Sequence, residues 1–215
     1  MGRPREFDTT EVLDKATHVF WVKGFEATSL NDLIEAMGIS KSSFYETFGN
    51  KQDLFLSSID HYATTALEDM VAALESDMPG REVIAQVFLN TANRFITNAE
   101  PMGCFLSNSA AELAPDCEPA KEKVVGYFHR AEEAFTKAVE RGQKEGTIPS
   151  DRDAKALGRF LVSSMNGLQV VGKANQDPQT LKDIVSSIIK ALDWKQKQIL
   201  AFSFDLFELR QTHIN

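Results

Sequence analysis

Apolar residues recur at helical spacing along most of this chain, and no useful stretch alternates apolar and polar residues in the two-residue period of a strand. Between residues 8 and 23, for example, Val12, Ala16, Val19 and Phe20 fall in phase. The same pattern predicts further helices over 29–37, 40–48, 51–74, 81–98, 105–113, 119–145, 154–173 and 178–192. The sequence therefore predicts an all-α fold.

Composition limits the classes of protein that this fold can serve. Hydrophobic residues make up 43% of the 215 residues, which is enough for a packed core. The net charge of −8 excludes a bulk nucleic-acid coat, so any DNA contact must come from a local basic cluster. Two cysteines, no apolar run of about 20 residues and no signal-like N-terminus favour a cytoplasmic protein without a membrane span.

Residues 29–48 carry the most informative local pattern. Ser29 and Ser40 are each suited to cap a short helix, and Gly38 interrupts the chain between the two helices. Two short helices at a glycine-containing turn form a helix-turn-helix, whose second helix can enter a DNA major groove. A plain helical hairpin inside an all-α core has the same spacing, and the spacing alone does not separate the two interpretations.

The segment from Ile39 to Lys51, which reads ISKSSFYETFGNK, resembles the recognition helix of the tetracycline-repressor (TetR) family of bacterial transcriptional regulators. Gly24-Phe25 followed by Thr28 is similar to the exit of the first helix in that family, and residues 2–5 (GRPR) resemble its basic N-terminal arm. The resemblance implies phosphate contacts by Thr28, Tyr45 and Lys51. It also implies groove contacts by Lys41, Ser42, Ser43 and Thr47, and minor-groove contacts by Arg3 and Arg5.

One residue and the charge balance depart from this pattern. Glu46 places a carboxylate in the predicted recognition helix, where it either points into solvent or accepts a hydrogen bond from a cytosine amino group. Residues 1–62 hold six basic and ten acidic side chains, but four of the basic ones lie in the arm or the recognition region. We therefore expect salt-sensitive DNA binding.

The remainder of the chain resembles the ligand-binding and dimerisation domain of the family. Residues 101–115 are similar to a Gly-Cys-Leu motif of one subgroup, with Phe105 in place of the leucine. The resemblance implies a four-helix dimer interface built from residues 154–173 and 178–192 of each chain. Residues 154–173 are apolar on nearly all sides and residues 178–192 carry one apolar stripe, which fits a partner, although a larger monomeric core has the same pattern.

Seven residues are candidates for a ligand pocket in this second domain: Phe88, Phe95, Cys104, Phe105, Phe128, Phe135 and Met165. Each aromatic is equally suited to ordinary core packing. Cys104 lies at the start of a predicted short helix, where backbone N–H groups stabilise a thiolate, and some subgroup members sense electrophiles at this motif. The alternative is that Cys104 packs as a small hydrophobic residue.

Catalytic patterns are absent from the sequence. It has no phosphate-binding glycine loop and no Gly-x-Ser-x-Gly, and its four histidines are scattered. We therefore expect no enzyme, no cofactor and no metal site. The predicted protein has a DNA-binding domain at 1–62 and a ligand-binding and dimerisation domain at 63–215. We expect a homodimeric repressor that binds a palindromic operator on double-stranded DNA and is released by a small apolar or electrophilic inducer. The alternative is a small-molecule or redox sensing module with only incidental DNA affinity.

Overall fold

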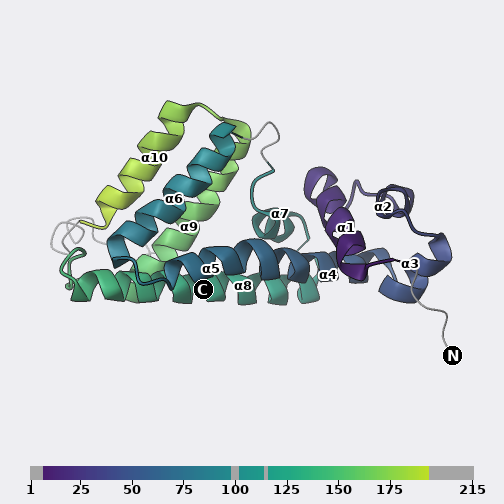
Figure 1. Ribbon diagram of the computed structural model, residues 1–215, viewed down its shortest axis with the longest axis horizontal. Coiled ribbons are helices and arrows are strands. Elements are labelled where there is room, and N and C mark those ends of the chain that lie inside the picture. Colours follow the sequence, from purple (N-terminus) through teal and green to yellow (C-terminus); the bar gives the residue numbers. More distant parts are fainter. Residues whose placement is uncertain (1–6, 98–101, 114–115, 194–215) are drawn as a thin grey trace, which may run out of the picture.

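The computed structural model describes residues 7–97, 102–113 and 116–193, and every regular element in these ranges is helical (Figure 1). The first four helices are α1 (Thr9–Lys23), α2 (Leu30–Met37), α3 (Lys41–Phe48) and α4 (Lys51–Tyr62). The predicted boundaries of α1, α2 and α3 and the predicted start of α4 are confirmed to within one residue. Asp8 caps α1 by accepting hydrogen bonds from Thr10 and Glu11, and Gly24 ends it with a positive φ of 82°.

The predicted helix over 51–74 contains an irregular turn that the sequence pattern did not indicate. After α4 the chain forms a π-helical turn from Ala63 to Leu67 and then continues as α5 (Glu68–Leu74). A π turn holds one residue more than an α turn and rotates the residues that follow it. Leu67 and Val71 are buried, whereas Ala66 and Met70 are only partly covered.

The other helices are α6 (Gly80–Thr97), α7 (Phe105–Glu112), α8 (Glu118–Lys144), α9 (Ala154–Ala174) and α10 (Pro178–Ala191). Figure 1 shows α1, α2 and α3 at one end of the molecule and α6, α9 and α10 at the other. The long helix α8 runs beneath α5 and reaches α4. Asp60 of α4 joins the two parts, since its carboxylate accepts hydrogen bonds from Lys123 Nζ at 2.8 Å and Tyr127 Oη at 2.9 Å.

Helix α9 packs closely on α8 because of a glycine. A Cβ atom built on Gly158 would lie 3.0 Å from the Glu132 carbonyl oxygen and still closer to Thr136 Oγ1. Any larger residue at this position would push the two helices apart. This contact fixes the face that α9 turns towards the core.

The opposite face of α9 is exposed in the single chain, so the core of the chain itself does not cover both sides of this helix. Phe160 retains 39% and Val170 retains 61% of their full exposure. Six exposed, uncharged positions on this face follow alternating steps of four and three residues: Ala156, Phe160, Ser163, Gly167, Val170 and Ala174. We call these six residues the α9 stripe. The charged residues Lys155, Arg159 and Lys173 are exposed beside them.

Candidate DNA-binding surface and ligand cavity

A reciprocal capping box begins the helix-turn-helix at α2. Ser29 Oγ accepts a hydrogen bond from the Asp32 N–H at 3.1 Å, and Asp32 Oδ2 accepts one from the Ser29 N–H at 2.8 Å. Lys23 Nζ, at the end of α1, lies 2.7 Å from Asp32 Oδ1. The hydrogen bond from Lys23, together with those from Ser29, holds the pKa of Asp32 well below its ordinary range. Asp32 is thus ionised at neutral pH and ties α1 to α2.

The turn between α2 and α3 follows the predicted geometry. Gly38 adopts the left-handed conformation, with φ 67° and ψ 31°, and its N–H donates to the carbonyls of Ile34 and Glu35. Ser40 caps α3 by accepting a hydrogen bond from the Ser43 N–H at 3.1 Å. The inner face of α3 is fixed by Phe44, which is fully buried, and by Phe48, which packs partly buried against the core.

The outer face of α3 carries exposed polar side chains. Lys41, Ser42, Tyr45 and Glu46 are exposed, and Tyr45 retains 48% of its full exposure. Ser43 and Thr47, also predicted for the groove, are half-buried on the flank of the helix. This surface presents hydroxyls, one ammonium group and one carboxylate at the end of the molecule farthest from α10 (Figure 1).

Of the other predicted DNA contacts, the structure describes Thr28 and Lys51. Thr28 is 1% exposed and its hydroxyl donates to the Gly24 carbonyl, so its side chain has no surface to offer a phosphate. The prediction for Thr28 therefore needs correction: this residue stabilises the connection before α2. Lys51 is half-buried at the start of α4, with Nζ 4.3 Å from the centre of the Phe25 ring. Arg3 and Arg5 lie outside the described residues.

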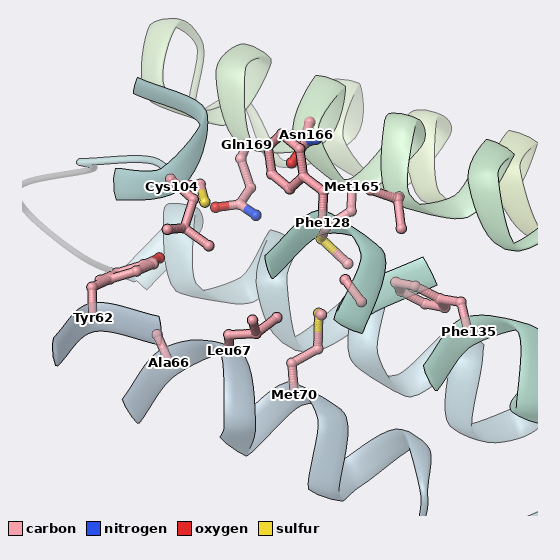
Figure 2. Close-up of a pocket in the computed structure, with 13 residues that line it drawn as sticks. Tyr62, Ala66, Leu67, Met70, Cys104, Phe128, Phe135, Met165, Asn166 and Gln169 are labelled. Atoms are coloured by element: carbon pink, nitrogen blue, oxygen red, sulfur yellow. The ribbon is translucent and has the colours of Figure 1, made fainter. Parts of the chain in front are cut away.

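A cavity lies between α8, α9 and the run from Tyr62 to Met70 (Figure 2). Its volume is about 60 Å³. Most of its walls are apolar, and the residues that line it are Tyr62, Ala66, Leu67, Met70, Cys104, Leu106, Phe128, Ala131, Phe135, Val162, Met165, Asn166 and Gln169. The cavity is narrow, so any ligand larger than a few atoms must displace part of this wall.

Four of the seven residues predicted for a pocket line the cavity: Cys104, Phe128, Phe135 and Met165. The other three belong to the core and correct the prediction. Phe88 packs on Phe135 with ring centres 6.0 Å apart, and Phe95 lies against Gly172, where any Cβ would collide with its ring. Phe105 does not line the cavity and packs in a cluster of rings from α1 and α4.

Sequence reasoning missed the residues that give the cavity its polar groups. Tyr62, Asn166 and Gln169 bring a hydroxyl and two amides into an otherwise apolar space (Figure 2). Ala66 and Met70 were also missed as pocket residues, because the π turn changes which residues of this part of the chain face the cavity. Asn166 and Gln169 lie three residues apart and therefore share one face of α9. Two amides on one face of an otherwise apolar helix were the signal in the sequence that could have identified them.

Cys104 lies at the end of the cavity nearest to α7, and it occupies the capping position of that helix. Its side chain is buried and its thiol is free. Tyr62 faces it from the opposite wall (Figure 2). Burial, and then the neighbouring Cys104 thiol, raise the pKa of the Tyr62 hydroxyl well above its ordinary range. Cys117, the other free cysteine, is buried elsewhere and accepts a hydrogen bond from Gln52 Nε2 at 3.2 Å.

A capped helix-turn-helix and a separate, mostly apolar cavity between α8, α9 and the end of α4 define the class of a DNA-binding protein with a second site for a small molecule. Two family descriptions match the same two parts of the chain: "Bacterial regulatory proteins, tetR family" over residues 12–57 and "Tetracyclin repressor-like, C-terminal domain" over residues 82–188. The chain belongs to the TetR family of bacterial transcriptional regulators.

Individual relatives support this assignment along nearly the whole chain. An HTH-type transcriptional regulator from Bacillus subtilis, YezE, is 35% identical over 90% of this chain and all of its own length. The repressor ComR from Escherichia coli is 30% identical over 88% of this chain and 90% of its own. A cysteine-substituted form of the TetR family regulator CifR, solved with 26 bp of operator DNA, matches with 30% identity and a TM-score of 0.79, covering 89% of this chain and all of its own.

The helices that the structure describes include none long and apolar enough to cross a membrane.

Proposed function

We propose that this protein is a ligand-responsive transcriptional repressor that binds a palindromic operator as a homodimer. The observation that carries the proposal is the helix-turn-helix with the exposed, polar outer face of α3, in a chain that also holds a separate cavity. The similar proteins ComR and CifR, one named a repressor and the other solved on operator DNA, support it. We further propose that it acts in the cytoplasm and is not an enzyme.

The DNA-binding domain in this proposal comprises residues 1–62. Lys41, Ser42, Ser43 and Thr47 face the major groove, while Tyr45 and Lys51 contact phosphates. Arg3 and Arg5 extend the contact into an adjacent minor groove. Because the net charge is −8 and the basic residues are few, binding should weaken steeply as salt rises.

The α9 stripe supports the homodimer. Its steps of four and three residues are those of a helix seam that packs on a second helix, and its six positions carry small or apolar side chains without charge. Gly167 lies in the middle of the stripe, and a Cβ atom there would meet nothing within 4 Å in the same chain. A glycine inside a helix lowers its stability, so its presence at an open surface favours a close approach by a second copy.

The inducer in this proposal is a small apolar or electrophilic molecule that enters the cavity of the domain formed by residues 63–215. The apolar walls select an apolar body, and Asn166, Gln169 and Tyr62 select a polar substituent. Because the cavity is narrow, the ligand favours a chain geometry with a wider cavity. Release then requires only that this geometry fit two half-sites less well.

Selection of binding sites from random duplexes, followed by a gel-shift titration, tests the proposal. Recovery of a palindrome with half-sites separated by ~34–36 Å, or about one helical turn, is the expected result. Its binding stoichiometry should be one dimer per duplex. No selected sequence, or equal binding to all duplexes, would instead support a sensing module with incidental DNA affinity.

Comparison of Cys104→Ser with the unsubstituted protein tests the electrophilic form of the inducer, with Cys117→Ser as the matched control. If Cys104 is the sensor, Cys104→Ser should keep its operator affinity when a quinone is added, whereas Cys117→Ser should lose affinity as the unsubstituted protein does. Equal release of all three proteins would point to reversible binding of an apolar ligand.

A further inference from the structure

Helix α7 touches the cavity at its first turn and the DNA-binding region at its last residue. Cys104 and Leu106, at the start, line the cavity. At the other end, the carboxylate of Glu112 accepts hydrogen bonds from two successive backbone N–H groups in the connection between α1 and α2. Phe25 N lies 2.9 Å from Oε2, and Glu26 N lies 2.9 Å from Oε1.

The connection after α1 is shaped to receive this carboxylate. Two neighbouring N–H groups that point to one spot form an anion-binding concavity, and both oxygens of Glu112 fill it. Gly24, the residue before them, has a φ of +82°, and a Cβ atom built on it would lie 2.9 Å from each of the two oxygens. A bare backbone with positive φ at residue 24 is therefore what lets Glu112 reach the connection.

The same connection leads directly into the helix-turn-helix. Three residues after Phe25 comes Thr28, which is buried and bonded to the Gly24 carbonyl, and Ser29 then caps α2. A shift of Glu112 relative to α1 would therefore act on the residues that set where α2 begins.

Other contacts hold α7 to the cavity wall and to the DNA-binding helices. Ser107 Oγ donates to Asn166 Oδ1 at 3.0 Å, and Asn166 lines the cavity. Phe105 packs against the rings of Phe55 and Tyr62, with centres 5.5 and 5.8 Å apart. An eight-residue helix spans only ~12 Å and moves as a rigid unit, so a displacement at its first turn also displaces its last residue.

We propose that Glu112 is a positioning residue that couples occupancy of the cavity to the placement of the helix-turn-helix. A molecule that widens the cavity near Cys104 and Leu106 displaces α7, and the carboxylate of Glu112 carries the displacement to Phe25 and Glu26. The gene-regulatory meaning of this coupling rests on the proposed function, but the coupling itself is a property of the chain that can be measured without DNA.

The experiment places added bulk in the cavity and measures the amide hydrogen exchange of residues 24–28. N-ethylmaleimide, attached to Cys104 in a Cys117→Ser background, is one probe, and attachment is verified by mass. The substitution Ala131→Leu, which adds bulk to the cavity wall, is the second. Each probe should change the exchange rate of the Phe25 and Glu26 amides in the otherwise unsubstituted chain.

Glu112→Ala should abolish that change, and Glu112→Gln, which keeps one acceptor oxygen, should preserve part of it. The matched control is Glu145→Ala: Glu145 also accepts a backbone hydrogen bond across a long sequence separation, from the Gly80 N–H at 2.9 Å, but lies away from α1 and α2. This control should lose a comparable amount of thermal stability and keep the full exchange response.

Operator affinity supplies the second readout. The ratio of dissociation constants with and without a cavity probe, expected between about 5 and 150 for a coupled pair of sites, should fall close to 1 in Glu112→Ala and stay unchanged in Glu145→Ala. The proposal is overturned if Glu112→Ala keeps the full ratio or the full exchange response. It is equally overturned if neither probe changes exchange at Phe25 and Glu26. An intact exchange response in a protein that selects no operator would refute the proposed function alone.

Discussion

Truncation of Phe160 tests the homodimer most directly. Its ring is the largest apolar side chain in the α9 stripe, and 39% of it is exposed in the single chain. An aromatic side chain has a surface of about 200 Å², so this fraction amounts to roughly 80 Å² for each copy. At about 25 cal/mol per Å², covering both copies contributes up to ~4 kcal/mol to the dimer, and most of that is lost in Phe160→Ala.

A loss of that size raises the dimer dissociation constant by about two to three powers of ten. Sedimentation equilibrium over a range of protein concentrations measures the constant, and circular dichroism verifies that the helices remain. Val125→Ala is the matched control, because Val125 is also a large exposed apolar residue, 46% exposed, but lies on α8. A constant that moves by less than about threefold in Phe160→Ala would refute the assignment of the interface to this stripe.

Three further predictions concern the helix-turn-helix. Tyr45→Ala and Lys51→Ala should each weaken binding to all duplexes alike, without a change in base preference, because both residues are assigned to phosphates; gel-shift titrations on specific and random DNA measure this. Glu46→Ala should raise non-specific affinity, and only a contact with cytosine predicts relaxed selection at one base pair of each half-site. Asp32→Asn should lower the melting temperature at neutral pH, because ionised Asp32 accepts hydrogen bonds from Ser29 and Lys23. The folded-state pKa of Asp32 is depressed, so its stabilising effect is present above ~pH 4 and fades as the pH falls further, and melting curves at several pH values should show the difference between the two proteins shrinking.

The boundaries of α1, α2 and α3 and the start of α4 could be predicted from sequence because their determinants are local. Ser29, Ser40 and Gly38 act within three or four residues of their own positions, as capping side chains or as a left-handed turn. The chemistry of these residues alone fixes where a helix begins and ends. The groove-facing residues of α3 came from the family resemblance, and of these Lys41 and Ser42 are exposed.

The cavity could be predicted only in part, because its lining depends on how distant helices meet. Phe88 and Phe135 look alike in the sequence, yet only Phe135 lines the cavity. The π turn at Ala63–Leu67 changes which residues of that helix face inward, and nothing in a regular helical pattern marks it. Thr28 was assigned to a phosphate by its position in a motif, but its environment is set by the Gly24 carbonyl and by burial.

The face of α9 shows a further limit of single-chain patterns. Apolar residues around a helix predict that it is covered, but they do not say whether the cover is the same chain or a second copy. In the structure Leu161 and Leu168 pack into the core, while Phe160 and Val170 remain exposed. The division between the two faces becomes visible only once the position of α8 is known.

Tyr62 and Glu112 each join the cavity to the DNA-binding helices, but they do so through different kinds of interaction. Tyr62 belongs to the cavity wall and packs its ring edge-on against Trp21 of α1, with centres 4.9 Å apart, so it acts by contact alone. Glu112 acts through two hydrogen bonds to backbone groups, which are lost when the carboxylate moves by about an ångström or turns away. A packed ring tolerates sliding and a hydrogen-bonded carboxylate does not. Because Tyr62 and Cys104 face each other across the cavity (Figure 2), a ligand that separates them disturbs both connections, and the connection through Glu112 is the less tolerant of the two.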